Sequence, residues 1–445
     1  MTDTRAKNST RGGRRDDDGS EGEVEEETSD AKIDRLATEI EELKASLLGV
    51  PESTDEWTQI KMTIKDKDAD RLVLVEKKRC DEVVKQYFED NPHILEAVPE
   101  CPVCLEKMWT PMHGAARYVC CGKEVCLKCH SQGGDVLNIC PLCRGKALKP
   151  TDEILPITKE KADSGAAWAQ AEMGTNYLLG DDGVQKDTEK ALSLFREAAK
   201  KGCVEAKEYL GDYYQDIENY VEARQWYETA AAEGRILSLC RLGLMMKNER
   251  AFDQNEQSQA EAFRLITICA TLYQGPFNLP AVELSQFFFD SPSVMLYYLR
   301  SAVEGGSANL SAMDYYARVL IHLAEDPDYH GFNYASVPGY SPIPEALFWF
   351  RQCSRTEEPD ADHPLVRLER KIRENCAHCR ADLPEARQSC CVECRAAYYC
   401  NRDCQVAHWK AGHKKDCVRK LKKRLRAERR LDEENNLLPW SHRRF

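Results

Sequence analysis

The sequence predicts a mainly α-helical protein in which a solenoid of paired helices is flanked by two small cysteine-rich modules. Two observations lead to this prediction. Residues 160–355 repeat alanine, leucine and aromatic side chains with helical spacing. Sixteen of the 21 cysteines fall in two windows, 101–143 and 376–417. We therefore expect one module at residues 101–144, the solenoid at 160–355 and the other module at 376–417.

The length, net charge and hydropathy of the chain limit the kinds of protein that it can be. A chain of 445 residues is long enough for about two to four domains. Its net charge of −13 argues against a general nucleic-acid-binding protein. No apolar stretch resembles a signal peptide or is long enough to span a membrane. We therefore expect an intracellular protein, in the cytoplasm, the nucleus or both, whose paired cysteines bind metal rather than form disulfides.

The N-terminal region begins with a charged tail. Residues 1–30 lack apolar periodicity, and nine of the fifteen residues from Asp16 to Asp30 are acidic, so we expect a disordered acidic tail. Residues 31–48 carry apolar side chains every three or four positions, which predicts a short amphipathic helix. Such a helix either docks elsewhere on the chain or self-associates as a coiled coil.

Residues 57–98 form a mixed segment. The stretch "RLVLVE" at residues 71–76 is expected to be a strand, because it is rich in aliphatic residues, and a helix is expected near 80–90. No functional motif marks this segment.

The solenoid prediction depends on an internal repeat. "AQAEMGTNYLLGDDGVQKDTEKALSLFREAAKKG" is followed by "VEAKEYLGDYYQDIENYVEARQWYETAAAEG". Small residues let two helices approach closely, large ones fill the seam between them, and the closing Gly202 and Gly234 supply left-handed caps. The segment resembles Sel1-like repeats, relatives of tetratricopeptide repeats, strongly over 163–234 and more weakly over 235–355. The resemblance implies an α-solenoid, whose aromatic residues form its core or a peptide-binding surface.

The first module contains eight cysteines, three pairs of them with Cys-x₂-Cys spacing. Four thiolates satisfy one tetrahedral zinc ion, so eight predict two. The eight cysteines are Cys101, Cys104, Cys120, Cys121, Cys126, Cys129, Cys140 and Cys143.

Their order and spacing resemble the all-cysteine form of a RING domain. The resemblance implies interleaved sites, one formed by Cys101, Cys104, Cys126 and Cys129, and the other by Cys120, Cys121, Cys140 and Cys143. The family leaves one residue between its third and fourth ligands, whereas Cys120 and Cys121 are adjacent. Both can bind one zinc only if the backbone kinks between them, so His113 remains an alternative ligand to Cys120.

The RING resemblance also raises the question of ubiquitin ligase activity. RING domains that recruit a ubiquitin-conjugating enzyme carry an apolar residue in the first cysteine pair, a proline in the last and often a basic residue after it. Val103, Pro141 and Arg144 stand at these positions. A RING has no catalytic nucleophile and acts by positioning the thioester. The alternative is a RING that serves only as a scaffold.

The second module has a more specific spacing. Residues 376–417 resemble a MYND zinc finger, with its "YYC", "HW" and final "H…C" elements. The resemblance implies one site formed by Cys376, Cys379, Cys400 and Cys404 and another by Cys391, Cys394, His413 and Cys417. The final gap holds one residue more than the common form, which leaves His408 as a rival to His413.

Every ligand of these predicted sites is a protein side chain. We expect about four structural zinc ions, none with an open position for chemistry and none acting on a small-molecule substrate. Recognition of proteins is then the expected function. MYND fingers bind proline-rich peptides, and Gln405 and Trp409 lie at the positions that line the family's groove. The alternative for Trp409 is core packing.

The C-terminal segment 418–445 is predicted to be a basic helical tail. From Val418 to Arg430, eight of thirteen residues are lysine or arginine. There are four alternatives for this helix: a solvated surface helix, a nuclear-import signal, a contact with nucleic acid, or an intramolecular partner of the acidic N-terminus. As a whole, the sequence predicts a zinc-binding scaffold that is either a RING-type ubiquitin ligase or a non-catalytic adaptor, for example in transcriptional regulation.

Overall fold

The structure is a computed structural model, and it describes most of the chain. The described residues are 27–52, 54–108, 115–126, 129–130, 140–145, 154–181, 183–252, 255–272, 279–288, 290–304, 310–325, 342–354, 363–383, 389–414 and 417–427. Most of the acidic tail expected at 1–30, the alternative ligand His113 and the end of the basic tail therefore lie outside the described residues.

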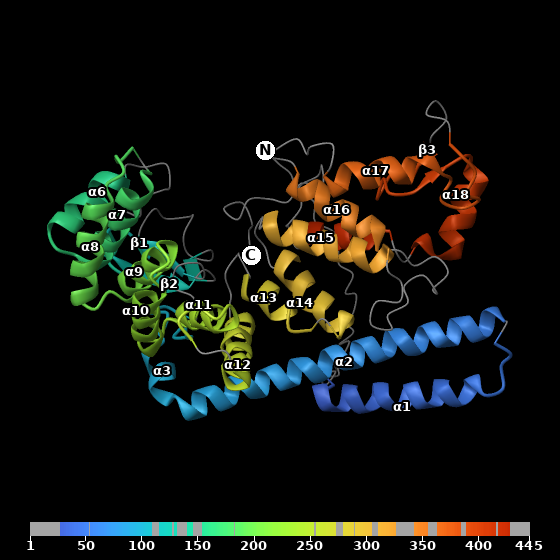
Figure 1. The fold of residues 1–445 in the computed structure, drawn as a ribbon, viewed down its shortest axis with the longest axis horizontal. Coiled ribbons are helices and arrows are strands. Elements are labelled where there is room, and N and C mark those ends of the chain that lie inside the picture. The colour runs from blue at the N-terminus through green and yellow to red at the C-terminus, as the bar shows by residue number, and fades with distance from the viewer. Residues whose placement is uncertain are drawn as a thin grey trace, which may run out of the picture.

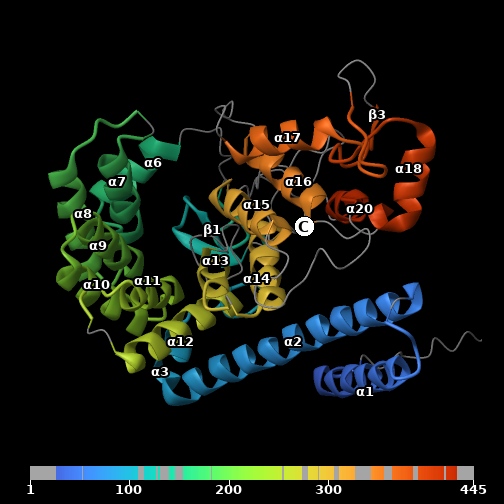
Figure 2. The ribbon, with the colours of Figure 1, turned by 45° about the vertical axis from the view of Figure 1, so that its right-hand side comes forward.

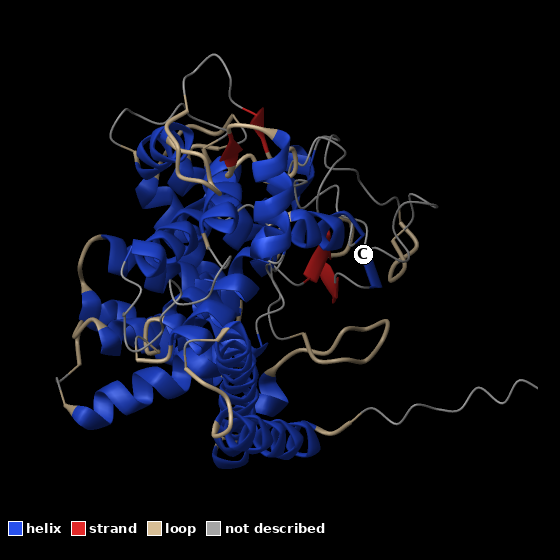
Figure 3. Ribbon diagram, turned by 90° about the vertical axis from the view of Figure 1, so that its right-hand side faces the viewer, coloured by secondary structure: helices blue, strands red, loops and turns tan. Residues whose placement is uncertain are grey.

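Helices dominate the described chain, and each of the two short sheets lies in one cysteine-rich module (Figure 3). The N-terminal helices are α1 (Ser29–Leu47), α2 (Asp55–Asp90) and α3 (Pro92–Ala97). The solenoid helices are α6 (Ile154–Asp163), α7 (Ala167–Leu179), α8 (Thr188–Lys200), α9 (Val204–Asp216), α10 (Tyr220–Ala232), α11 (Ile236–Lys247), α12 (Glu256–Leu272), α13 (Leu279–Ser285), α14 (Pro292–Glu304), α15 (Leu310–Glu325) and α16 (Ile343–Cys353).

The remaining elements belong to the two modules and the C-terminal region. The first sheet pairs β1 (Ala115–Tyr118) with β2 (Lys123–Cys126), and the second pairs β3 (Ser389–Cys390) with β4 (Tyr398–Tyr399), both antiparallel. The C-terminal helices are α17 (Pro364–Glu374), α18 (Arg402–His408), η4 (Trp409–His413) and α20 (Arg419–Ala427).

The solenoid consists of successive antiparallel helix pairs, from α7 and α8 to α15 and α16, as the sequence predicts (Figure 1). Its first two pairs are held by one apolar cluster that includes Phe195, Leu210 and small alanines. The small residues allow the close approach. A Cβ on Gly211 of α9 would lie 2.5 Å from the ring of Tyr227 in α10, and one on Gly174 of α7 equally close to Phe195 in α8.

This contact gives a first prediction. Gly211→Ala is expected to destabilise the repeats by about 1–3 kcal/mol, because the added methyl group cannot fit against the fully buried Tyr227 ring. Urea unfolding followed by helical circular dichroism measures the change. Gly49→Ala is the matched control, since a Cβ there meets nothing within 4 Å. Equal stability of the two variants would contradict this account of the repeat.

The strand expected at 71–76 is wrong, because α2 is helical throughout Asp55–Asp90. The valines that favour a strand are surrounded by lysine, arginine, aspartate and glutamate, and α2 packs against α1, α12 and α14. α2 runs along one side of the molecule, and α1 lies alongside it (Figures 1 and 2). α1 buries Leu36 and Ile40, so the expected amphipathic helix docks within the chain. Self-association stays a prediction.

The two cysteine-rich modules are attached to the helices differently. The first has a small core of its own, formed by Cys101, Met108, Tyr118, Val125 and Cys140. The core of the second is continuous with α14 to α17 and α20, and includes Tyr399 and Leu425. Within the described residues, no helix is both long and apolar enough to cross a membrane.

Candidate metal centres

Four clusters of cysteine and histidine side chains stand out among the described residues. In each cluster, four ligand atoms lie within 4.8 Å of one another. In chain order the clusters are Cys101, Cys104, Cys126 and Cys129; Cys120, Cys121, Cys140 and Cys143; Cys376, Cys379, Cys400 and Cys404; and Cys391, Cys394, His413 and Cys417. In both modules the first ligand pair thus meets the third, and the second meets the fourth.

The separations within the clusters fit zinc. Two thiolates bound tetrahedrally at about 2.3 Å from a zinc ion lie about 3.8 Å apart. In the first cluster Cys104 Sγ lies 3.7 Å from Cys126 Sγ. In the second cluster Cys120 Sγ lies 3.5 Å from Cys143 Sγ. The sulfur atoms are therefore arranged as one tetrahedral ion requires.

Four of the five Cys-x₂-Cys pairs share one turn, which explains why their spacing suits a metal. In these four pairs the residue after the second cysteine has a left-handed backbone, with φ between 51° and 64°, whereas His130 after Cys129 is helical. These residues are Leu105, Arg144, Arg380 and Arg395. In the first of them the Leu105 N–H donates to the Cys101 carbonyl at 2.8 Å, which closes the turn and directs both sulfurs to one side. The left-handed conformation costs about 1–2 kcal/mol for a residue with a side chain, which metal binding offsets.

The adjacent cysteines Cys120 and Cys121 lie in the turn of the β1–β2 hairpin. Tyr118 pairs with Lys123 across the hairpin, and the N–H of Gly122 donates to the Tyr118 carbonyl at 2.7 Å. Gly122 has a φ of 72°, so the backbone reverses there. The hairpin turn brings both neighbouring cysteines to one cluster, since Cys121 Sγ lies 3.8 Å from Cys140 Sγ and Cys120 Sγ lies 3.5 Å from Cys143 Sγ.

Backbone amides also prepare the thiols for metal binding. Burial alone would raise the pKa of Cys101, but the amide of Cys126 and two amides of its own turn outweigh it and lower the pKa to about 6. Cys376 is also buried, and amides of its turn and of Cys400 lower its pKa to about 6. Each module thus begins with a cysteine that is a thiolate near neutral pH, which is the form that binds zinc.

The extra residue in the final gap of the second module is absorbed by a π-helical turn. η4 holds Gly412 at φ 150°, where the helix is interrupted. As a result His413 Nε2 lies 3.5 Å from Cys394 Sγ. A nitrogen and a sulfur on one tetrahedral zinc lie about 3.6 Å apart. The rival His408 lies outside the cluster, and its ring stacks on His413 with centroids 4.9 Å apart.

Each module places a tyrosine–histidine pair beside its clusters, which sequence reasoning missed. Tyr118 Oη lies 3.1 Å from His130 Nδ1, and Tyr399 Oη lies 3.1 Å from His408 Nδ1. Burial, with a smaller contribution from His413, lowers the pKa of His408 to about 4. His408 is therefore neutral near pH 7. No cysteine or histidine spacing in the sequence indicates either tyrosine–histidine pair.

The residues predicted to contact partners are accessible to different degrees. Val103 is 50% exposed, and Pro141 and Arg144 are exposed. Gln405 is half-buried, and its side-chain oxygen accepts a hydrogen bond from Arg402. Trp409 is also half-buried, and it packs against the core shared with the helices. Both alternatives for Trp409 thus remain, since one part of its ring is covered and another is accessible.

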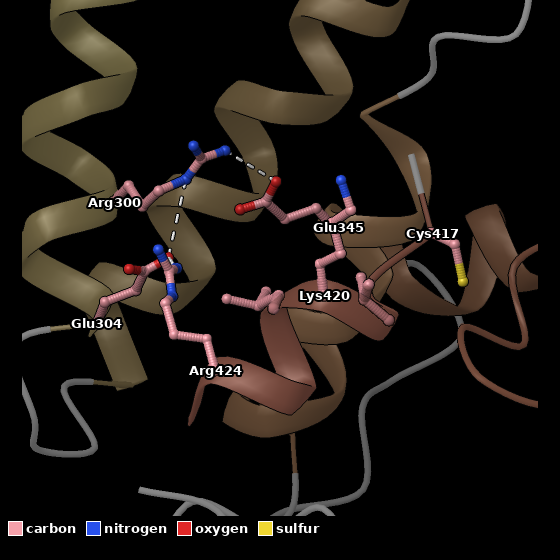
Figure 4. A pocket seen from close by; sticks show the side chains of 8 residues that line it. Arg300, Glu304, Glu345, Cys417, Lys420 and Arg424 are labelled. Carbon is pink, nitrogen blue, oxygen red and sulfur yellow. Dashed lines mark hydrogen bonds and ion pairs between the residues drawn. The ribbon is translucent and has the colours of Figure 1, made fainter. Parts of the chain in front are cut away.

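The second module is fixed to the end of the solenoid. Arg351 of α16 donates to the carbonyl of Cys394 at 2.9 Å and pairs with Glu369 of α17. A cavity of about 290 Å³ lies between α14, α16 and α20 (Figure 4). Arg300 pairs with Glu345 at its edge, at 3.0 Å. Arg424 of α20 pairs with Glu304 of α14 at 2.5 Å, so the ion pairs beside the cavity join α20 to the solenoid.

Family models match two parts of the chain. The MYND finger model matches residues 376–417. Residues 376–417 are a MYND finger. The Sel1 repeat model matches residues 169–203 and 204–234, which are the helix pairs α7–α8 and α9–α10. Neither match covers 101–144, so the RING resemblance depends on the residues and their geometry alone. No curated protein matches the chain.

Two solved structures are similar to parts of the chain. One is a Sel1 repeat protein from Oxalobacter formigenes, with 21% identity, a TM-score of 0.37, and coverage of 46% of this chain and 79% of that one. The other is a protective antigen of uropathogenic Escherichia coli with an SLR fold, with 20% identity and a TM-score of 0.34, and coverage of 63% of this chain and 53% of that one. Together with the four clusters, the two family-model matches describe a zinc-binding protein-interaction scaffold with a MYND finger, Sel1 repeats and about four zinc sites.

Proposed function

We propose that the first module is a RING-type ubiquitin ligase domain, and that the repeats and the MYND finger select its protein partners. We assign as zinc ligands the sixteen side chains of the four clusters. None of the 21 cysteines forms a disulfide, which is consistent with a reducing, intracellular location.

The accessibility of three residues supports the ligase assignment. Val103 and Pro141 project from two zinc-binding turns, and Arg144 follows the second of these turns. All three are exposed, although the β1–β2 hairpin of the same module is held against α7 and α9 through Arg117. A RING stimulates transfer by holding the loaded conjugating enzyme in a reactive geometry, so it needs an exposed contact surface on a fixed support.

Autoubiquitination of the zinc-loaded chain with a panel of conjugating enzymes tests this proposal. Arg144→Ala is expected to reduce chain formation about tenfold or more, since the basic residue positions the thioester. Arg395→Ala is the matched control, because Arg395 occupies the same turn position in the MYND finger and is also exposed. Absence of zinc-dependent chains with every enzyme, or equal activity of the two variants, would leave the non-catalytic adaptor as the function.

For the MYND finger we propose binding of a proline-rich peptide at Gln405 and Trp409. An aromatic wall suits an extended proline-rich segment, and the neighbouring Val406 is 40% exposed. Gln405→Ala and Trp409→Ala are each expected to weaken capture of a proline-rich peptide by about tenfold. Zinc content is the control, because Trp409 also contacts His413. Unchanged capture by both variants at full zinc content would contradict the proposal.

A further inference from the structure

The hairpin of the first module contacts the solenoid through an arginine and through the glycine of its turn. Arg117 lies on β1, and its side chain is only 17% exposed. Its guanidinium donates to Glu124 on the neighbouring strand and, at 2.9 Å, to Glu205 of α9. Hydrogen bonds between two charged groups are about twice as strong as neutral ones, so this contact anchors the module.

The turn of the hairpin fits against a tryptophan of α7. A Cβ on Gly122 would lie 2.2 Å from Trp168 Nε1, so the turn backbone and the indole are in direct contact. The Arg117 guanidinium lies 5.7 Å from the centre of the same ring. Trp168 and Glu205 therefore form one docking face, which receives an arginine and the glycine of a turn.

Arg117 is one of three arginines that pair with a row of carboxylates on α9. Glu205, Glu208 and Asp212 lie three and four residues apart, on one side of the helix. The second pairs with Arg235 and the third with Arg241, both from the next repeat. The solenoid thus supplies the arginine partners of Glu208 and Asp212, and the first module supplies Arg117 as the partner of Glu205.

Among the described residues, the first module shares no apolar core with the solenoid. Its core is a cluster of its own, whereas the core of the MYND finger is continuous with the surrounding helices. The turn that contacts Trp168 also holds Cys120 and Cys121, which immediately precede Gly122. The shape of the docked turn therefore depends on the second cluster.

We propose that the docking face formed by Trp168 and Glu205 is a binding surface for an arginine-bearing turn, and that the first module fills it within the chain for as long as zinc holds the Cys120–Cys121 turn. The proposal does not depend on ligase activity. The face is covered in the zinc-loaded chain and opens when the second cluster loses its metal.

Charge reversal in the zinc-loaded full chain tests the contact. Arg117→Glu and Glu205→Arg are each expected to raise hydrogen exchange about tenfold in the hairpin and in the first turns of α7 and α9, and the double variant to restore protection. Arg318→Glu is the control, since Arg318 makes an exposed ion pair in α15. A double variant no better protected than either single one would overturn the docking.

A pair of cysteine variants tests the zinc dependence. Cys143 and Cys379 are both exposed second cysteines of their pairs, one in each module. Cys143→Ser is expected to raise exchange in the first turns of α7 and α9 about tenfold, and Cys379→Ser to leave it unchanged. Unchanged exchange in Cys143→Ser, or full zinc content in that variant, would overturn the proposal.

Discussion

Chelation of zinc is expected to unfold both cysteine-rich modules while α10 to α12 stay folded. The core of the first module has only five buried residues, two of which are cysteines. A finger of about 40 residues is too small to fold on its core alone. Zinc supplies about 10–16 kcal/mol at each structural site, which is as large as the whole stability of a typical domain. The helices α10 to α12 are instead stabilised by apolar cores that contain none of the proposed metal ligands.

Hydrogen exchange before and after chelation measures this effect. Exchange should approach the unprotected rate over the described parts of both modules and rise in α17 and α20, whose core is continuous with the MYND finger. Protection in α10 to α12 serves as the internal control. Restoration of zinc should restore both modules. Modules that stay protected without metal would show that their cores suffice, and that the clusters are not structural zinc sites.

Removal of the buried Glu208 carboxylate is expected to destabilise the repeats strongly. Glu208 and Arg235 are 3% and 4% exposed, and Arg235 Nε lies 2.5 Å from Glu208 Oε2. Burial opposes the charge on Arg235, but Glu208 outweighs it and holds the pKa of the guanidinium above its usual range. Glu208→Leu should destabilise the repeats by about 3–5 kcal/mol, because a buried cation is left without its partner.

Hydrogen exchange in α9 to α11 reports this loss, and a double variant provides the control. With Glu208→Leu and Arg235→Leu together, no charge is left unpaired, so most of the stability should return. The exposed pair of Arg224 and Glu228 gives a second comparison, expected to be worth less than about 1 kcal/mol. A Glu208→Leu variant as stable as the double variant would contradict the role of the pair.

Patterns that act over a few residues were predicted well from the sequence. The periodic alanines and aromatics indicate the helix pairs, because each repeat must bury the same face. Cysteine spacing indicates the turns, and the cluster geometry is consistent with the predicted sites. The strand expected at 71–76 was wrong, because packing against three other helices outweighs the preference of two valines.

Features that leave no distinctive residue pattern in the sequence could not be predicted. The contact of Arg117 with Glu205 joins residues 88 positions apart, and neither side chain differs locally from a solvated charge. The π-helical turn at Gly412 is visible only as one extra residue in a gap. The hairpin turn that brings Cys120 and Cys121 to one cluster ends at Gly122, and a glycine alone does not fix the direction of a turn.

Zinc content per chain tests the central claim most directly. Four clusters, each with four converging ligands, predict about four zinc ions in the purified full-length protein. Cys143→Ser and Cys379→Ser should each lower the content by about one, because they disrupt different clusters. Two or fewer zinc ions in the unmodified chain would contradict the four-site architecture and the functions proposed for both modules.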